Sequence, residues 1–178
     1  TWARVLHPFL GVVMFVAFCM VSSGTYYWND LLDVHHDRNH PVKRHRPIAS
    51  GALNLGVARV IGTLLLVGGI ALAFVPSNKA GAAAAVYVVI TISYSTVLKY
   101  IAVVDLVAVA SGFIVRAVGG AVAVGVPLST WFLLTTSFAA LFIVTGKRYA
   151  ELRELGDGTS VRATLEEYSL GFLRIVLS

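Results

Sequence analysis

The chain has 178 residues, of which 57% are hydrophobic and only 13% are charged, and its mean hydropathy is +0.80. This composition excludes an ordinary water-soluble domain and makes a lipid bilayer the expected partner. The formal net charge of +5 does not indicate nucleic-acid binding, because the basic residues fall between long apolar runs and not along one polar face. Cys19 is the single cysteine, which excludes an internal disulfide and a cysteine-based metal site.

Five apolar runs are long enough, or nearly so, for the roughly 20 residues that a helix needs to cross hydrocarbon. They cover residues 5–28, 55–75, 81–98, 104–124 and 130–145. A sixth run opens at about Leu165 and is still apolar at Ser178, and the first opens without an initiator methionine, so we expect a fragment of a longer protein. The runs predict an all-α, polytopic transmembrane helical bundle, with five complete spans and the start of a sixth in one domain over residues 1–178.

Two polar segments, 38–54 and 147–164, fall on the same side of the membrane if each run crosses once, and so does the turn at 99–103. That side carries nine Lys and Arg residues outside the runs, against two on the other side. The excess predicts a multi-pass plasma-membrane protein whose charged chemistry faces the cytoplasm.

An acidic motif ends the first run, where residues 29–37 read Asn-Asp-Leu-Leu-Asp-Val-His-His-Asp. Helical periodicity predicts that Asp30, Asp33 and Asp37, spaced i, i+3 and i+7, lie along one helix face with Asn29 beside them. Neighbouring carboxylates repel one another and need a compensating cation. Oxygen ligands favour Mg²⁺, which shares its shell with substrate phosphates, so we expect these four residues to bind Mg²⁺ and a diphosphate.

Two simpler interpretations explain this motif less well. A solvated acidic helix end does not account for the regular spacing beside a basic loop. A zinc site at His35 and His36 is disfavoured, because consecutive helical residues point about 100° apart and suitable cysteine ligands are missing from the sequence.

The acidic motif and the basic loop after it resemble the first signature of the UbiA family of intramembrane prenyltransferases. The resemblance covers residues 29–37, then Arg38, Lys43-Arg44, Arg46-Pro47-Ile48 and Ser50-Gly51, together with the helix layout. It implies nine transmembrane helices around a central cavity, of which this chain would supply helices two to six and part of the seventh.

Members of that family that prenylate aromatic acceptors carry a second aspartate-rich motif after the sixth helix, whereas residues 146–152 here read Gly-Lys-Arg-Tyr-Ala-Glu-Leu. Lys147 and Arg148 can neutralise phosphate without a metal, so we expect a different substrate. This segment, Tyr94-Ser95-x-x-Leu98-Lys99 and Ile114-x-Arg116-Ala117-x-Gly119-Gly120 are similar to the decaprenyl-phosphate phosphoribosyltransferase branch. The similarity implies magnesium-dependent transfer of 5-phosphoribose from phosphoribosyl pyrophosphate to decaprenyl phosphate, releasing pyrophosphate, for cell-wall arabinan precursor synthesis.

The catalytic role falls to the three aspartates, whose bound metal would stabilise the departing pyrophosphate. Two interpretations stay open for Lys43, Arg44 and Arg46, which either bind phosphate or form a basic loop set by topology and anionic lipids. For Lys147 and Arg148 the family resemblance favours phosphate binding over a stop-transfer role.

Arg116 lies about 12 residues into its run, where an unpaired guanidinium is costly unless it faces a cavity or an anion. We expect a phosphate contact there in preference to a structural pairing. Tyr94 and Lys99 either contact substrate or anchor a helix end at the membrane interface. Asp105 and Glu151 either bind a second ion or the ribose hydroxyls, or pair with a nearby basic residue.

Two other functions fit the sequence less well. A UbiA-type polyprenyl transferase acting on an aromatic acceptor is disfavoured by the missing second aspartate motif. A membrane transporter is disfavoured because the acidic residues cluster at one interface, whereas transporter sites lie near the midplane. Assembly as a homo-oligomer is left open.

Overall fold

The computed structural model describes residues 2–155 and 168–177, and all regular secondary structure within them is helical. Five long helices make up the body: α1 (Trp2–Leu32), α3 (Leu55–Ala73), α4 (Asn78–Thr96), α5 (Val104–Ala123) and α6 (Thr130–Leu155). The shorter elements are α2 (Val34–Asn39), the 3-10 turns η1 (Lys43–His45) and η2 (Leu98–Tyr100), and α7 (Leu170–Leu177). The predicted all-α fold is confirmed.

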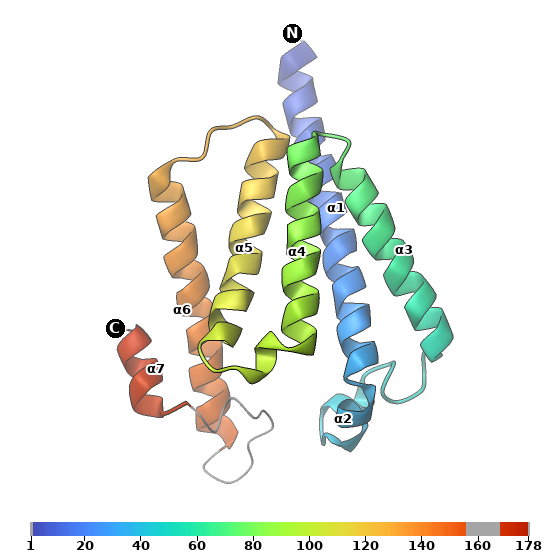
Figure 1. The fold of residues 1–178 in the computed structure, drawn as a ribbon, viewed down its shortest axis with the longest axis vertical. Coiled ribbons are helices and arrows are strands. Elements are labelled where there is room, and N and C mark those ends of the chain that lie inside the picture. Colours follow the sequence, from blue (N-terminus) through green and yellow to red (C-terminus); the bar gives the residue numbers. More distant parts are fainter. Residues whose placement is uncertain (1, 156–167, 178) are drawn as a thin grey trace.

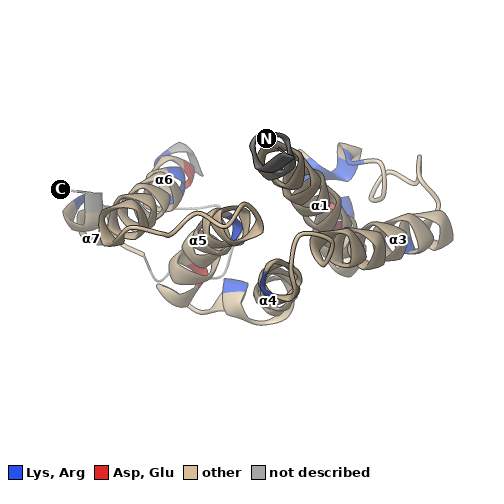
Figure 2. Cartoon of the chain, turned by 90° about the horizontal axis from the view of Figure 1, so that it is seen from above, with Lys and Arg blue, Asp and Glu red and all other residues tan. Residues whose placement is uncertain are grey.

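Consecutive long helices are antiparallel, so the chain runs up and down through the bundle (Figure 1). Seen from above, the helices form a curved row in the order α6, α5, α4, α1 and α3 (Figure 2). The lower end in Figure 1 carries α2, the segment that leads to α3, the α4–α5 turn and the C-terminal end of α6. The polar parts of the chain therefore gather at one end of the bundle.

Side-chain caps mark the starts of α3 and α4. The Asn54 side-chain oxygen accepts a hydrogen bond from the Gly56 N–H at 2.7 Å, at the start of α3. The Ser77 hydroxyl accepts from the Ala80 N–H at 3.1 Å, at the start of α4. Each cap satisfies one of the N–H groups that a helix start leaves without an intrahelical partner.

Small residues allow α1 and α3 to approach closely. A Cβ added at Gly69 of α3 would lie 2.7 Å from Val21 Cγ2 and 2.9 Å from the Ala17 carbonyl oxygen. A Cβ added at Gly24 of α1 would lie 2.8 Å from Leu66 Cγ. Membrane helices associate through such close packing, because lipid supplies little hydrophobic drive between them.

The outer surface of the bundle is apolar, as a bilayer requires. Large hydrophobic side chains such as Phe15, Leu64, Phe138 and Trp131 are exposed, the last at 79%. Among the described residues, four helices are long and apolar enough to cross a membrane: His7–Leu32, Leu55–Ala73, Val104–Ala123 and Thr130–Arg153. α4 has the same length as α3, 19 residues, but is not among the four because it includes more polar residues. These features describe an integral membrane protein.

Two helix boundaries differ from the runs read in the sequence. The first helix bends at Asp33, so that α1 and α2 divide the acidic motif between them. α6 continues ten residues past Thr145 to Leu155, because Lys, Arg, Ala, Glu and Leu are strong helix formers even where the segment is no longer apolar. α7 lies within the sixth run, whose expected start at Leu165 is outside the described residues.

We expect Gly69→Ala to destabilise the full-length protein by about 1–3 kcal/mol, because its methyl group would overlap the α1 backbone. Thermal unfolding in detergent measures the effect. Gly120→Ala is the matched control, since nothing lies within 4 Å of a Cβ there. If Gly69→Ala unfolds at the wild-type temperature, the close α1–α3 packing is wrong.

Candidate functional site

A cavity of about 740 Å³ lies among α1, α4, α5 and α6 and reaches the end where the polar segments gather. Six basic and four acidic side chains line it, so its charge is net positive. They are Asp30, Asp33, Asp37, Lys43, Arg46, Lys99, Arg116, Lys147, Arg148 and Glu151.

The bend at Asp33 determines where the acidic side chains point. The backbone of Asp33 has φ −90° and ψ 3°, yet hydrogen bonds continue through it from the Asp33 N–H to the Asn29 carbonyl and from the Asp37 N–H to the Asp33 carbonyl. All three carboxylates line the cavity. Asp30 and Asp37 form ion pairs with one cation, Arg46, and Asp33 forms an ion pair with another, Lys99.

Arg46 is the cation that joins Asp30 and Asp37. Its Nη1 donates to Asp30 Oδ1 and to Asp37 Oδ2, both at 2.9 Å. Asp37 is only 3% exposed, and a carboxylate so buried is costly without a counter-charge. The backbone near Arg46 is fixed in turn by Arg38, whose Nε donates to the Ala49 carbonyl at 3.1 Å.

A neutral histidine holds the turn that carries Lys43 to the cavity. His40 Nδ1 accepts from the N–H groups of Val42 and Lys43 at 3.1 and 3.2 Å. Burial and the nearby Lys43 charge keep the pKa of His40 below its ordinary value. The imidazole therefore stays unprotonated at neutral pH and can accept both hydrogen bonds.

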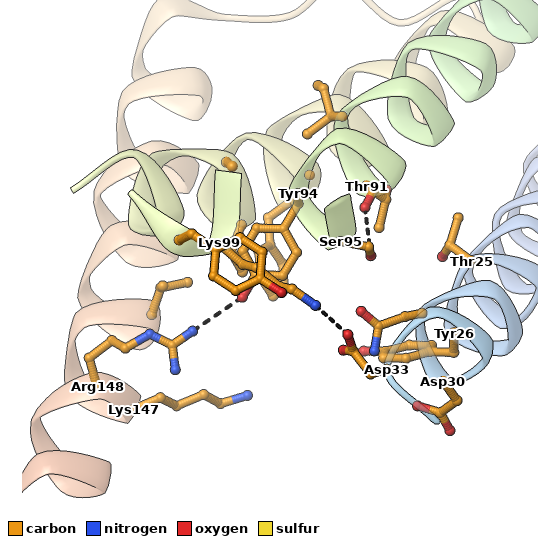
Figure 3. Close-up of a pocket in the computed structure, with 18 of the residues that line it drawn as sticks. Thr25, Tyr26, Asp30, Asp33, Thr91, Tyr94, Ser95, Lys99, Lys147 and Arg148 are labelled. Atoms are coloured by element: carbon orange, nitrogen blue, oxygen red, sulfur yellow. Dashed lines mark hydrogen bonds and ion pairs between the residues drawn. The ribbon is translucent and has the colours of Figure 1, made fainter. Parts of the chain in front are cut away.

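Lys99 reaches Asp33 from the opposite side of the cavity. Its Nζ donates to Asp33 Oδ1 at 2.5 Å, across 66 positions of sequence (Figure 3). Lys99 lies in η2, directly after α4, so this ion pair connects the end of α4 to the end of α1.

The last turns of α6 place Lys147 and Arg148 at the cavity (Figure 3), and Glu151 also lines it. Arg148 Nη1 donates to Glu151 Oε2 at 2.6 Å, and Nη2 donates to the Tyr94 hydroxyl at 3.4 Å. The described part of this polar segment is the helical end of α6. Its helical i, i+3 spacing is what brings Arg148 and Glu151 to one face.

Asp105 is behind the cavity and not in its lining. Its side chain is 1% exposed and accepts from Arg148 Nε at 3.1 Å and from the Tyr168 hydroxyl. Of the two interpretations that the sequence allowed for Asp105, pairing with a basic residue is the one observed.

Arg116 lies deeper in the cavity, beside aromatic rings. Its guanidinium carbon is 4.6 Å from the centre of the Phe113 ring and 5.3 Å from that of Tyr87. The Tyr87 hydroxyl also lies 3.5 Å from Arg116 Nη1 and donates to Ser22 Oγ at 3.3 Å. Cation–π contacts therefore stabilise a guanidinium that has no carboxylate partner among the described residues.

The donor chemistry of the acidic motif suits a hard cation. Asn29 and the three aspartates all line the cavity and offer oxygen ligands, and Asp30 and Asp37 already converge on one cationic nitrogen. Within residues 2–155 and 168–177, no group of three or more His, Cys, Asp or Glu side chains is arranged to hold a metal ion. A metal here would therefore take part of its shell from water or phosphate, as Mg²⁺ commonly does.

The cavity collects every site residue expected from the sequence except Arg44. Arg44 is exposed and donates through Nε to His45, because neighbouring residues of a 3-10 turn point about 120° apart. Its expected contact with substrate is therefore not supported by this structure. Tyr87 and Tyr168 were missed, since a single tyrosine in or beside an apolar run carries no local signal.

The sequence matches the model of the UbiA prenyltransferase family over residues 1–156. It is 42% identical to the decaprenyl-phosphate phosphoribosyltransferase of Mycolicibacterium smegmatis, over 92% of this chain and 52% of that protein. The protein of the same name from Corynebacterium glutamicum is 41% identical over 92% of this chain and 50% of its own length. Nodulation protein NoeC of Azorhizobium caulinodans is 36% identical over 79% of this chain and 46% of its own length. The chain spans about half the length of the curated relatives it matches.

We expect Arg46→Gln to lower the stability of the full-length protein by about 1–3 kcal/mol, because it leaves the buried Asp37 without its cation. Added Mg²⁺ should raise the unfolding temperature more for this variant than for wild type, because in the variant the ion does not compete with Arg46 for the carboxylates of Asp30 and Asp37. Arg44→Gln, two residues away but outside the cavity, is the control. Equal thermal unfolding of the two variants, with and without Mg²⁺, would contradict this role of Arg46.

Proposed function

Because the chain belongs to the UbiA prenyltransferase family, we propose that the full-length protein transfers 5-phosphoribose from phosphoribosyl pyrophosphate to decaprenyl phosphate. Pyrophosphate is released, and the product is a precursor for cell-wall arabinan. The observation that carries this proposal is the cationic face of α6, where Lys147 and Arg148 line the cavity opposite the acidic motif. The names of the relatives from Mycolicibacterium and Corynebacterium support the same acceptor.

The charges of the cavity suit two anionic substrates. Its basic residues outnumber its carboxylates by two, and Lys147 has no ion pair with any described residue. A Lys or Arg side chain binds phosphate directly, without a bridging metal. The donor carries a 5-phosphate besides its diphosphate, so a second cationic face has a ligand to hold.

In the proposed reaction Asp30, Asp33, Asp37 and Asn29 would hold Mg²⁺ against the diphosphate of the donor. When bound, the metal neutralises charge that accumulates on the leaving pyrophosphate. Arg46 and Lys99 now neutralise these carboxylates, and in the proposed reaction each would exchange a carboxylate for a phosphate oxygen.

The bond changes need no protein base. An oxygen of the lipid phosphate forms a bond to the anomeric carbon of the donor, while the bond from that carbon to the pyrophosphate oxygen breaks. The second pKa of a phosphate monoester is near 6, so the attacking group is largely dianionic at neutral pH. The residues of the chain therefore serve to bind, orient and neutralise.

We further propose that the protein is a multi-pass plasma-membrane enzyme with the cavity mouth toward the cytoplasm. The polar segments that gather there carry most of the Lys and Arg residues, as the positive-inside rule requires for cytoplasmic segments. A cavity among membrane helices suits both substrates, because the polyprenyl chain can remain in lipid while its phosphate meets the water-soluble donor.

An aromatic-acceptor prenyltransferase explains the cavity less well. Such an enzyme grips a prenyl diphosphate between two acidic motifs, and here the second position is basic apart from Glu151, which is paired with Arg148. A transporter is also less consistent, since the acidic motif lies at the end of α1 and in α2, at the lower end of the bundle in Figure 1.

We expect the full-length protein, with Mg²⁺ and labelled phosphoribosyl pyrophosphate, to label decaprenyl phosphate and release pyrophosphate. Excess EDTA should abolish the reaction, because the acidic motif holds the donor only through a divalent cation. Thin-layer chromatography of the extracted lipid measures the product. Full turnover in EDTA would reject the metal role, and transfer of a prenyl group to an aromatic acid would reject the proposed reaction.

We expect Lys147→Asp to weaken donor binding at least about tenfold, because an acid would replace a cation next to a multiply charged ligand. The variant should fold normally, since Lys147 holds no described ion pair, whereas Arg148→Asp would also leave Asp105 buried and unpaired. Calorimetric titration with phosphoribosyl pyrophosphate and Mg²⁺ measures the affinity. Arg153→Asp, on the same helix but outside the cavity, is the control. Wild-type donor affinity in Lys147→Asp would refute the proposed contact between Lys147 and the donor.

A further inference from the structure

A buried chain of hydrogen bonds runs behind the cavity, from the start of α5 to the end of α6. The Val103 N–H donates to the Tyr168 hydroxyl at 2.6 Å, that hydroxyl donates to Asp105 Oδ1, and Asp105 Oδ2 accepts from Arg148 Nε at 3.1 Å. Tyr168, Asp105 and Arg148 are 5%, 1% and 8% exposed, so water does not compete for these contacts. Of the three, only Arg148 lines the cavity.

The two oxygens of Asp105 have different partners, and this fixes the plane of the carboxylate. Oδ1 accepts from Tyr168, which comes from the segment before α7, and Oδ2 accepts from α6. The Tyr168 hydroxyl is the proton donor to Asp105 and also accepts from the Val103 N–H, so both of its polar contacts are internal to the protein. Asp105 can then orient Arg148 without losing its own orientation.

The guanidinium of Arg148 is correspondingly constrained. It has five N–H donors, and three are used by Asp105, Glu151 and Tyr94. Among the described contacts, one N–H on each terminal nitrogen is left, and Nε is turned to Asp105 behind the cavity. A planar group held in this way keeps two N–H donors for an anion, and charge-assisted hydrogen bonds from arginine bind phosphate strongly.

We propose that Asp105 and Tyr168 are positioning residues for substrate binding, which hold the Arg148 guanidinium in the orientation that receives a phosphate of the donor. This inference rests on the proposed function, because it takes a phosphate group as the ligand of Arg148. Neither residue touches the substrate, and both act through Arg148. Binding of the acceptor, decaprenyl phosphate, does not depend on this chain of hydrogen bonds.

The backbone between η2 and α5 makes Tyr168 part of the same system. Val103 has φ +68°, a conformation that strains a β-branched residue, and its N–H is bonded to the Tyr168 hydroxyl. Phe172 stacks on the Tyr168 ring, with centroids 6.0 Å apart, and Leu173 nearby is fully buried. Tyr168 is therefore held from α7 while it supports both the strained turn and Asp105.

A double-mutant cycle tests the proposal in the full-length protein, with the affinity for phosphoribosyl pyrophosphate and Mg²⁺ measured by calorimetric titration. We expect Asp105→Asn and Tyr168→Phe each to weaken donor binding, by about tenfold for Asp105→Asn, while KM for decaprenyl phosphate stays unchanged. Combined with Arg148→Gln, each change should have no further effect on donor affinity, because a positioning residue has nothing left to position.

The other outcomes overturn the inference in distinguishable ways. If the effects of Asp105→Asn and Arg148→Gln are additive, or if KM for both substrates rises together, Asp105 only supports the fold. If Asp105→Asn does not fold, Tyr168→Phe decides alone, against Tyr149→Phe, a tyrosine that packs in the same apolar cluster but outside the cavity. If wild type binds no phosphoribosyl pyrophosphate, the proposed function fails and the inference with it, whereas a wild type that binds and an unchanged Asp105→Asn refute the inference alone.

Discussion

The site depends on the neutralisation of carboxylates that a membrane protein has partly withdrawn from water. An isolated buried carboxylate is costly, and here every described acidic side chain at or behind the cavity is paired with a cation from another segment or turn of the fold. Arg46, Lys99 and Arg148 supply these charges from the α2–α3 segment, η2 and α6. The ion pairs therefore join the helix ends as well as balancing charge.

Helix packing makes these pairs possible. Glycines let α1 and α3 approach closely at one end of the curved row, while α5 and α6 lie at the other, and the cavity lies among α1, α4, α5 and α6. The antiparallel order brings the end of α1, the end of α4 and the end of α6 to the same side of the bundle. Residues far apart in sequence, such as Asp33 and Lys99, consequently meet in space.

The two faces of the cavity hold charge in different ways, and this difference underlies the proposed reaction. The acidic face consists of oxygen ligands whose present partners are side chains from a loop and a turn, which a metal-bound diphosphate would replace in the proposed reaction. The α6 face presents cations on a rigid helix, and Arg148 is fixed there by three hydrogen bonds. In the proposed reaction, a donor with a diphosphate and a separate phosphate would bind to both faces at once.

The sequence by itself determined the helical membrane fold, the acidic motif, the basic α6 segment and the family resemblance, because long apolar runs and closely spaced charges are local patterns. It also indicated Arg116, whose charge inside an apolar run required a special environment. Only the tertiary structure decided that the acidic motif bends at Asp33, that Arg44 points away from the cavity and that Asp105 lies behind it. The partners of Asp105, Arg148 and Tyr168 lie up to 65 positions apart, and which of several nearby charges forms an ion pair depends on helix packing and burial, which no local pattern in the sequence records.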